Sequence, residues 1–128
     1  MPNHWNTLAS SDLDRTRAFY EALGFEVQSG PPGVPCVVVK PAPDITICFF
    51  IEAAFARMTF GRAVDASASQ ELVQSLGYTD RDEVDELVAA AEAAGAPETR
   101  PGIQQPWGYG GGFSDPDGHV WAALWMPR

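Results

Sequence analysis

The chain holds few side chains whose types and spacing could support bond-breaking chemistry. Its two histidines, His4 and His119, stand near opposite ends of the sequence, which gives little support for a Ser-His-Asp triad. No G-x-S-x-G nucleophile elbow occurs, and Cys36 and Cys48 show neither C-x-x-C nor zinc-ligand spacing. Neither cysteine has a base partner visible in the sequence, so we expect free thiols on strands. These residues do not predict hydrolytic catalysis.

Carboxylates are densest in one short stretch, residues 80–86. Paired carboxylates can act as a general acid and base, but this stretch also has the pattern of a helix start. A negative first turn complements the helix dipole. We therefore interpret these residues as a solvated helix face. They are Asp80, Asp82, Glu83, Asp85 and Glu86.

An aromatic and glycine-rich stretch, residues 102–113, is the best candidate for a binding surface. Trp107 and Tyr109 come just before Gly111 and Gly112. Consecutive glycines in a strand let a ligand or another backbone approach closely. The two rings suit stacking on a flat or cationic ligand, but they would equally serve to cover the core or a subunit interface. No βαβ phosphate-binding context surrounds the glycines.

Length and charge narrow the class of protein. We expect a single domain over residues 1–128, because this length allows one sizeable core. No apolar run could span a membrane and no signal-peptide pattern opens the chain, so we expect a cytoplasmic protein. The formal net charge is −9 and the pI is about 4.4. With eight Lys and Arg residues, a basic patch for nucleic acid or an anionic membrane is hard to build.

The elements that must position these residues follow a repeated order. In unit one, residues 4–52, a strand at 5–10 leads to a helix that Ser11 or Asp12 caps and Gly24 ends. Three more strands are expected at residues 25–28, 36–39 and 45–51. A connection over residues 53–69 lacks clear periodicity and is expected to be a loop. Its apolar residues could fold over a ligand, or pack against a neighbouring subunit or the sheet rim; they are Phe55, Met58 and Phe60.

Unit two, residues 70–126, repeats the order. A strand at 70–78 precedes a helix capped by Thr79 or Asp80 and ended by Gly95. The apolar stripe of this helix is Val84, Leu87, Val88 and Ala91. Further strands are expected at residues 96–100, 108–114 and 119–126.

The last strand begins at a turn with recognisable chemistry, Asp115-Pro116-Asp117-Gly118. Proline presets its own φ, aspartate can bond its own backbone, and glycine accepts a positive φ. The strand that follows alternates its side chains between two faces. One face carries His119, Trp121, Ala123 and Trp125, and the other carries Val120, Ala122, Leu124 and Met126.

Residues 11–25 and 113–125 together resemble the vicinal oxygen chelate superfamily, which contains glyoxalases, bleomycin-resistance proteins and extradiol dioxygenases. The matching residues are Asp12, Leu13, Thr16, Phe19, Tyr20, Leu23, Gly24 and Phe25, then Asp115, Pro116, Asp117 and Gly118. The resemblance implies an α+β fold in which two tandem β-α-β-β-β units form an open, cup-shaped mixed sheet with helices on the convex side. It also implies a homodimer, because such proteins are commonly dimers.

The resemblance further implies where a metal would bind. Metal-dependent members hold a divalent ion with one residue from each of the first, fourth, fifth and eighth strands. Those positions fall here on Trp5, on one of Thr46, Cys48 or Phe50, on or near Val73, and on Ala122. Only Cys48 could coordinate a metal. The usual metal site therefore looks absent, and we expect no metal cofactor.

Displaced ligands are the alternative: His4, Glu52, Glu71 and His119 flank those positions. A one-residue displacement turns a strand side chain to the opposite face unless a bulge intervenes. With such ligands the chain would be a lyase, isomerase or dioxygenase of the glyoxalase type, holding one Zn, Ni, Mn or Fe ion.

The sequence thus favours a protein that binds a small organic molecule without metal and performs no catalysis, by analogy with the bleomycin-resistance branch, whose members sequester a drug. The acidity of the chain would suit a cationic ligand through long-range attraction. A third possibility is a role in protein association, with a pocket closed by its own side chains. The expected ligand-binding residues are Trp5, Thr7, Cys48, Phe50, Val73, Ser75, Trp107, Tyr109 and Ala122.

Overall fold

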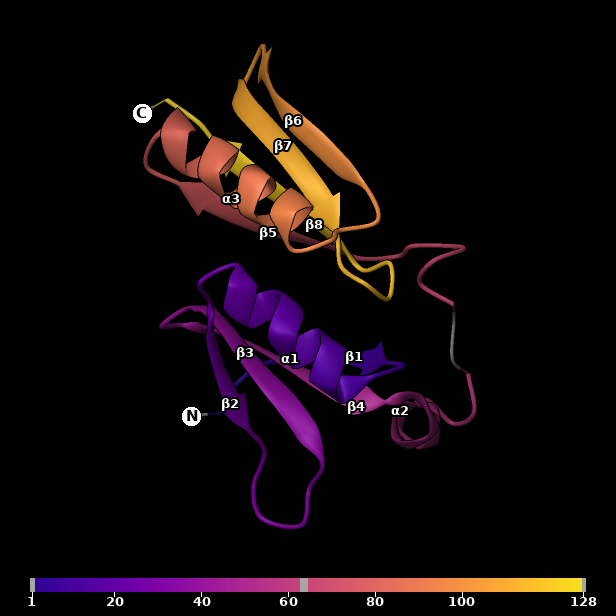
Figure 1. The fold of residues 1–128 in the computed structure, drawn as a ribbon. Helices are drawn as coiled ribbons and strands as arrows, with labels where there is room; N and C mark the ends of the chain where they lie inside the picture. The colour runs from indigo at the N-terminus through magenta and orange to yellow at the C-terminus, as the bar shows by residue number, and fades with distance from the viewer. Residues whose placement is uncertain (1, 63–64, 128) are drawn as a thin grey trace. The chain divides into compact units, whose positions relative to one another are not determined.

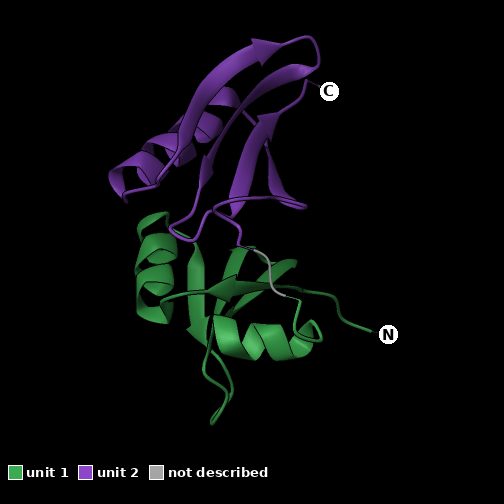
Figure 2. Ribbon diagram, turned by 90° about the vertical axis from the view of Figure 1, so that its right-hand side faces the viewer, with its two compact units in different colours: residues 1–64 green, residues 65–128 purple. Residues whose placement is uncertain are grey.

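The computed structural model describes residues 2–62 and 65–127. The chain divides into two compact units, residues 1–64 and residues 65–128 (Figure 2). No helix in the described part of the chain has the length and apolar character needed to cross a membrane. The elements, labelled in Figure 1, are β1 (Asn6–Ser10), α1 (Leu13–Ala22), β2 (Glu26–Ser29), β3 (Cys36–Ala42), β4 (Ile45–Ile51), α2 (Glu52–Met58), β5 (Val73–Tyr78), α3 (Arg81–Ala93), β6 (Thr99–Gln105), β7 (Gly108–Ser114) and β8 (Val120–Trp125).

Unit 1 is a four-stranded sheet in the order β1-β4-β3-β2, with α1 lying across one face (Figure 1). β1 runs parallel to β4, and the other pairs are antiparallel. The core lies between the sheet and α1, where Tyr20 is fully buried with its ring 5.2 Å from that of Phe49. Val39 and Ile47 are also fully buried. We call the opposite face of this sheet the open face of unit 1.

The ends of α1 follow the expected local chemistry. The Asp12 side chain caps the helix by accepting a hydrogen bond from the Arg15 backbone amide at 3.1 Å. The helix stops before Gly24, whose φ of 83° suits glycine. A buried hydrogen bond of 2.7 Å between the hydroxyls of Ser10 and Thr16 ties β1 to the first turns of the helix.

Unit 2 repeats the arrangement, with the sheet order β5-β8-β7-β6 and α3 on one face. The predicted apolar stripe of α3 is buried: Val84, Leu87, Val88 and Ala91. Beneath it Trp121 is fully buried and its ring stacks on Phe113 at 6.0 Å between centroids. We call the face of this sheet opposite α3 the open face of unit 2. The repeated β-α-β-β-β order confirms the expected α+β class and its tandem units.

The turn before β8 forms as the sequence predicts. The Gly118 amide donates to the Asp115 carbonyl at 2.9 Å, and φ of Gly118 is 93°. The buried Asp115 carboxylate accepts from the backbone amides of Asp117 and His119 at 3.0 and 2.9 Å. The side chain therefore satisfies backbone donors that the tight turn leaves unpaired.

Two expectations about the elements are wrong. The connection after β4 is not all loop, because Glu52–Met58 forms α2; a helix this short shows no apolar period, although its alanines favour helix. The strand expected at residues 96–100 instead runs from Thr99 to Gln105. It continues through Pro101 and Gly102 by means of a register shift between Arg100 and Ile103.

Smaller shifts affect two further strands. β3 runs on to Ala42, past the end expected at residue 39, and also shifts register between Val39 and Ala42. β5 begins at Val73, three residues after the predicted start. In both cases the strand ends where pairing with its neighbour ends, which the local sequence does not specify.

Candidate functional site

Of the residues predicted in unit 1, those that lie on strands face its open side. Thr7 pairs with Cys48 across β1 and β4, and Cys48 pairs with Val38 across β4 and β3. Paired residues point to the same side of a sheet, which is here the side opposite the buried Phe49. Trp5 precedes β1 and is 54 % exposed. Thr7 and Cys48 therefore share the open face of unit 1.

Cys36 and Cys48 are free thiols, as expected. They share the open face, because Cys36 pairs with Phe50 and Cys48 lies two residues from Phe50. Burial raises the pKa of both thiols, and the neighbouring Cys36 raises the pKa of Cys48 further. A raised pKa keeps a thiol protonated and weakly nucleophilic near neutral pH. Neither cysteine is thereby activated for catalysis.

Phe50 lines a pocket of about 430 Å³ in unit 1. Its neighbours there come from the loop before β3, from the end of β4 and from α2, and they include Val34, Ile51 and Met58. Arg57 supplies the charged group in this lining. The remainder of the lining is apolar, and nothing in it could fix the orientation of a polar ligand at more than one point.

The residues predicted in unit 2 form rows across its open face. Arg100, Gly112, Ala122 and Ser75 pair in turn across β6, β7, β8 and β5. In the next row Val73 pairs with Val120, which pairs with Ser114. Val73, Ser75 and Ala122 therefore share one face, as the sequence analysis supposes.

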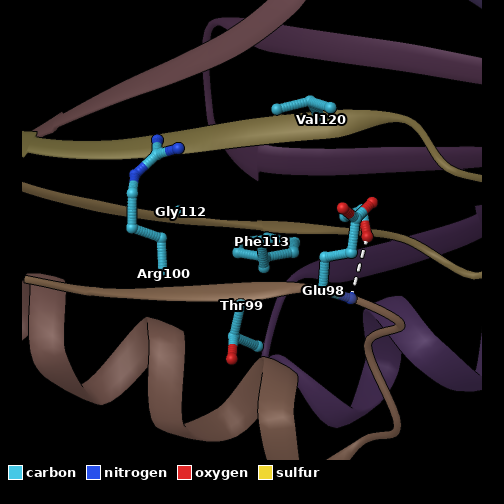
Figure 3. A pocket seen from close by; sticks show the side chains of 7 residues that line it. Glu98, Thr99, Arg100, Gly112, Phe113 and Val120 are labelled. Atoms are coloured by element: carbon cyan, nitrogen blue, oxygen red, sulfur yellow. Dashed lines mark hydrogen bonds between the residues drawn. The ribbon is translucent and has the colours of Figure 1, made fainter. Parts of the chain in front are cut away.

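A second pocket, of about 210 Å³, lies at the β6 side of these rows (Figure 3). It combines the side chains of Glu98 and Arg100 with the backbone of β7. Figure 3 shows both side chains extending toward β8 on the same side of the sheet, whereas Thr99 between them points the other way. The pocket is lined by Glu98, Thr99, Arg100, Gly112, Phe113, Ser114 and Val120.

Glycine is required at the floor of this pocket. A Cβ at Gly112 would lie 2.6 Å from the Trp121 carbonyl oxygen and 2.9 Å from Nη2 of Arg100. The Arg100 guanidinium therefore lies directly over the Gly112 backbone. The register shift that follows Arg100 is the kind of irregularity that re-aims a side chain. The Ser114 hydroxyl at the end of β7 accepts a hydrogen bond of 3.1 Å from the Glu98 backbone amide. This bond ties the residue before β6 to β7.

Trp107 and Tyr109 lie on opposite faces of the sheet. A Cβ at Gly110 would lie 2.9 Å from both Cη2 of Trp107 and Cδ2 of Leu124, and Gly110 shares the face of Leu124. Trp107, which is 45 % exposed, thus lies on the open face. Tyr109 pairs with Trp125 on the face that α3 covers, so it does not lie on the open face with Ala122, although both are expected among the ligand-binding residues.

The Tyr109 ring already has a cation and a hydrogen-bond partner from α3. The Arg81 guanidinium carbon lies 5.2 Å from the Tyr109 ring centroid and 4.9 Å from that of Trp125. The Tyr109 hydroxyl donates to Asp85 at 2.6 Å. That hydrogen bond, followed by burial and the Asp85 charge, raises the pKa of Tyr109. This tyrosine fastens α3 to the sheet.

The residues present do not fit a metal ion. Over residues 2–62 and 65–127, no three His, Cys, Asp or Glu side chains lie close enough together to hold one. Of the displaced candidates, His4, Glu52 and Glu71 are exposed. His119 is buried, and its backbone is bonded to Asp115 in the turn. Metal sites in proteins need three or four converging ligands.

Glu98 and Arg100 are the functional candidates that sequence reasoning missed. Their signal was the alternation of two charged residues with Thr99 between them, which places both on one face of a strand. Charged side chains that alternate along an edge strand also commonly serve only to keep the protein soluble and to prevent edge-to-edge aggregation. Only the pairing of Arg100 with Gly112 shows that the charges border a pocket.

Three solved structures resemble the whole chain. A hypothetical protein from S. aureus is 26 % identical with a TM-score of 0.87, covering 98 % of this chain and 95 % of that one. A glyoxalase-related enzyme from Fulvimarina pelagi is 22 % identical with a TM-score of 0.77, covering 98 % and 90 %. A bleomycin-binding protein complexed with bleomycin is 23 % identical with a TM-score of 0.67, covering 99 % and 100 %.

The fold comparison agrees with the family comparison. No curated protein matches the sequence. The family model described as Glyoxalase/Bleomycin resistance protein/Dioxygenase superfamily matches residues 3–123, which is nearly all of the chain. That span includes α1 and the turn at residues 115–118 on which the resemblance rests. The chain therefore belongs to the glyoxalase/bleomycin resistance protein/dioxygenase superfamily.

Proposed function

We propose that this chain binds a small organic molecule on the open face of unit 2, and that it sequesters this molecule without a resident metal. The observation that carries the proposal is the pocket of about 210 Å³ beside Gly112. There a guanidinium and a carboxylate stand at a concave surface with a backbone floor. Small-molecule sites typically combine an apolar floor with a few placed polar groups.

The side chains next to the pocket on the open face are small, and this supports binding of a ligand there. Ser75 and Ala122, which follow Gly112 in its row, carry small side chains, so a ligand can approach the sheet closely there. Val73 and Trp107 lie on the same open face and are each about half exposed. Their exposed apolar surface would be buried by a ligand, which contributes about 25 cal/mol per Å².

The donor set supports binding without metal. The positions at which the family resemblance implies metal ligands carry Trp5, one of Thr46, Cys48 or Phe50, a residue at or near Val73, and Ala122. Zinc and iron prefer imidazole, thiolate and carboxylate ligands, and no group of three such side chains occurs among the described residues. A solved relative is described as a bleomycin-binding protein in complex with bleomycin, which supports sequestration as the mode of action.

A thermal-shift screen tests the proposal. Metal-stripped protein is heated with a library of small organic molecules that includes bleomycin, and compounds that raise Tm are tested again on Ala122→Phe. This substitution fills the floor of the open face. The matched control is Ala89→Phe, because Ala89 is exposed on α3. Hits that Ala122→Phe abolishes and Ala89→Phe keeps support the proposal. If no compound raises Tm, or if the hits survive Ala122→Phe, the proposal is wrong.

A further inference from the structure

Two opposite charges border the pocket of unit 2 without pairing with each other. Glu98, the residue before the edge strand β6, and Arg100 in that strand extend to the same side (Figure 3). Alternate residues of a strand are about 7 Å apart. Among the described residues, neither side chain has a hydrogen bond or ion pair, and both residues are exposed. Their charges are therefore available to a ligand.

We infer, on the basis of the proposed function, that the ligand is a zwitterion of the α-amino-acid kind with an apolar side chain. Its carboxylate pairs with the Arg100 guanidinium, whose planar fork matches two carboxylate oxygens. Its ammonium donates to the Glu98 carboxylate, which can only accept. The two charges of such a ligand are separated by a single carbon atom, and this suits partners that approach from two neighbouring positions of one strand.

The charge balance of the pocket favours a zwitterion over a simple ion. A simple anion that contacted Arg100 would lie beside the Glu98 carboxylate, and a simple cation at Glu98 would lie beside Arg100. Like charges brought together in this way oppose binding. The chain also carries a net charge of −9, which repels anions at long range but acts little on a molecule without net charge.

The size of the pocket and the open face beside it determine the size of the ligand and the kind of side chain that it carries. About 210 Å³ is below the range of about 300–1,000 Å³ typical of sites for drug-sized molecules. From Arg100 the open face continues over Ala122 to Leu124 and to the exposed Trp107 ring, whose Cη2 lies over Gly110. An unbranched aliphatic side chain lying over Ala122 would reach that ring and bury part of it.

Three probes with six carbon atoms each separate the possibilities: L-norleucine is the zwitterion, hexanoate the anion and hexylamine the cation. Each is titrated into isotope-labelled, metal-stripped protein, and backbone amide shifts are followed by NMR. We expect norleucine to shift the amides of Gly112, Ser114 and Val120 with millimolar affinity. It should bind at least about fivefold more tightly than the other two probes, because it alone engages both charges.

Variants assign the two charges. Arg100→Gln and Glu98→Gln should each weaken norleucine binding by about fivefold or more. Glu98→Gln should also remove the discrimination against hexanoate. The matched controls, Arg62→Gln in unit 1 and Glu92→Gln on α3, alter exposed charges elsewhere and should leave binding unchanged.

The inference and the proposed function fail in different ways. If hexanoate or hexylamine binds the same amides as tightly as norleucine, the inference is overturned while the proposed function stands. The inference is also overturned if norleucine binds elsewhere, binds equally well to Arg100→Gln, or does not bind. The proposed function fails as well only if the compound screen yields no hit that depends on Ala122.

Discussion

At the scale of single residues, the face on which an aromatic ring lies decides what it can bind. The Tyr109 ring already has Arg81 over it at 5.2 Å, so this face of the ring is occupied by a cation of the chain itself. Trp107 has its ring on the open face beside Gly110. Both rings were expected at one site from the sequence. Trp107 lies in the β6–β7 turn and Tyr109 in β7, so strand alternation alone did not separate them.

The Tyr109 hydroxyl should make stability depend on pH in the alkaline range. Its pKa is raised above the ordinary value near 10, chiefly by the bond it donates to Asp85. A raised pKa in the folded state means that the contribution to stability is complete below about pH 10 and is lost as pH rises through the raised pKa. Tyr109→Phe should therefore be less stable than the wild type at pH 8, with a difference that shrinks at higher pH. Urea unfolding from pH 8 to 11 measures this; a difference that stays constant or grows would contradict it.

Gly112, in the middle of β7, should tolerate a side chain on the open face poorly. Gly112→Ala brings a Cβ against the Trp121 carbonyl oxygen, which is backbone and cannot move aside easily. We expect a loss of about 1–3 kcal/mol in the free energy of unfolding, measured by urea denaturation, together with weaker norleucine binding as Arg100 is displaced. Gly77→Ala is the matched control, because a Cβ there meets nothing within 4 Å. Equal effects of the two substitutions would refute the close-approach argument.

At the scale of elements, the parts that follow from local chemistry could be predicted from the sequence. Asp12 and Asp80 cap their helices through their own side chains, and Gly118 adopts the positive φ that its turn demands. The path of β6 could not be predicted, because Pro101 and Gly102 normally break a strand. Pairing with β7 overrides that preference. α2 was missed because it is too short to show a helical period.

The cap of α3 should be worth a measurable part of the stability of unit 2. The Asp80 carboxylate accepts from the Glu83 amide at 3.0 Å. Asp80→Ala removes this bond and should cost about 1 kcal/mol, as read from the shift in the urea midpoint. Asp82 lies two residues later, in the first turn of the same helix. Asp82→Ala therefore removes a charge near this helix end without removing the cap bond. If both variants lose equal stability, the effect is due to charge and not to capping.

At the scale of the whole chain, the sequence was informative about fold and only partly about the site. The motifs at residues 11–25 and 113–125 identified the superfamily that the family model matches. Alternation along β5 places Val73 and Ser75 on one face, and the pairing of Ser75 with Ala122 in the structure adds Ala122 to it. Arg100 could not be assigned in this way, because its position over Gly112 depends on the register of β6 against β7, a contact between segments distant in sequence.

The homodimer implied by the family resemblance remains a prediction. Its best-suited surface is the exposed apolar group around α2, in which Phe60 is 88 % and Met58 48 % exposed. Sedimentation equilibrium should give about twice the chain mass of 13.8 kDa. Phe60→Asn should favour the monomer while keeping the backbone, because asparagine tolerates the φ of 57° found there. Leu72→Ser in unit 2 is the control. A wild-type mass of one chain at all concentrations would contradict the prediction.

The central claim is that the open face works without a metal ion, and calorimetric titration of metal-stripped protein with Ni, Zn, Mn and ferrous ions tests it most directly. The positions that would supply ligands carry side chains such as Val73 and Ala122, so we expect no stoichiometric binding. Elemental analysis of the dialysed protein should likewise find no bound metal. Binding of one ion per chain more tightly than about 10 μM, roughly −7 kcal/mol, would contradict the account and direct attention to His4, Glu52, Glu71 and His119 as ligands.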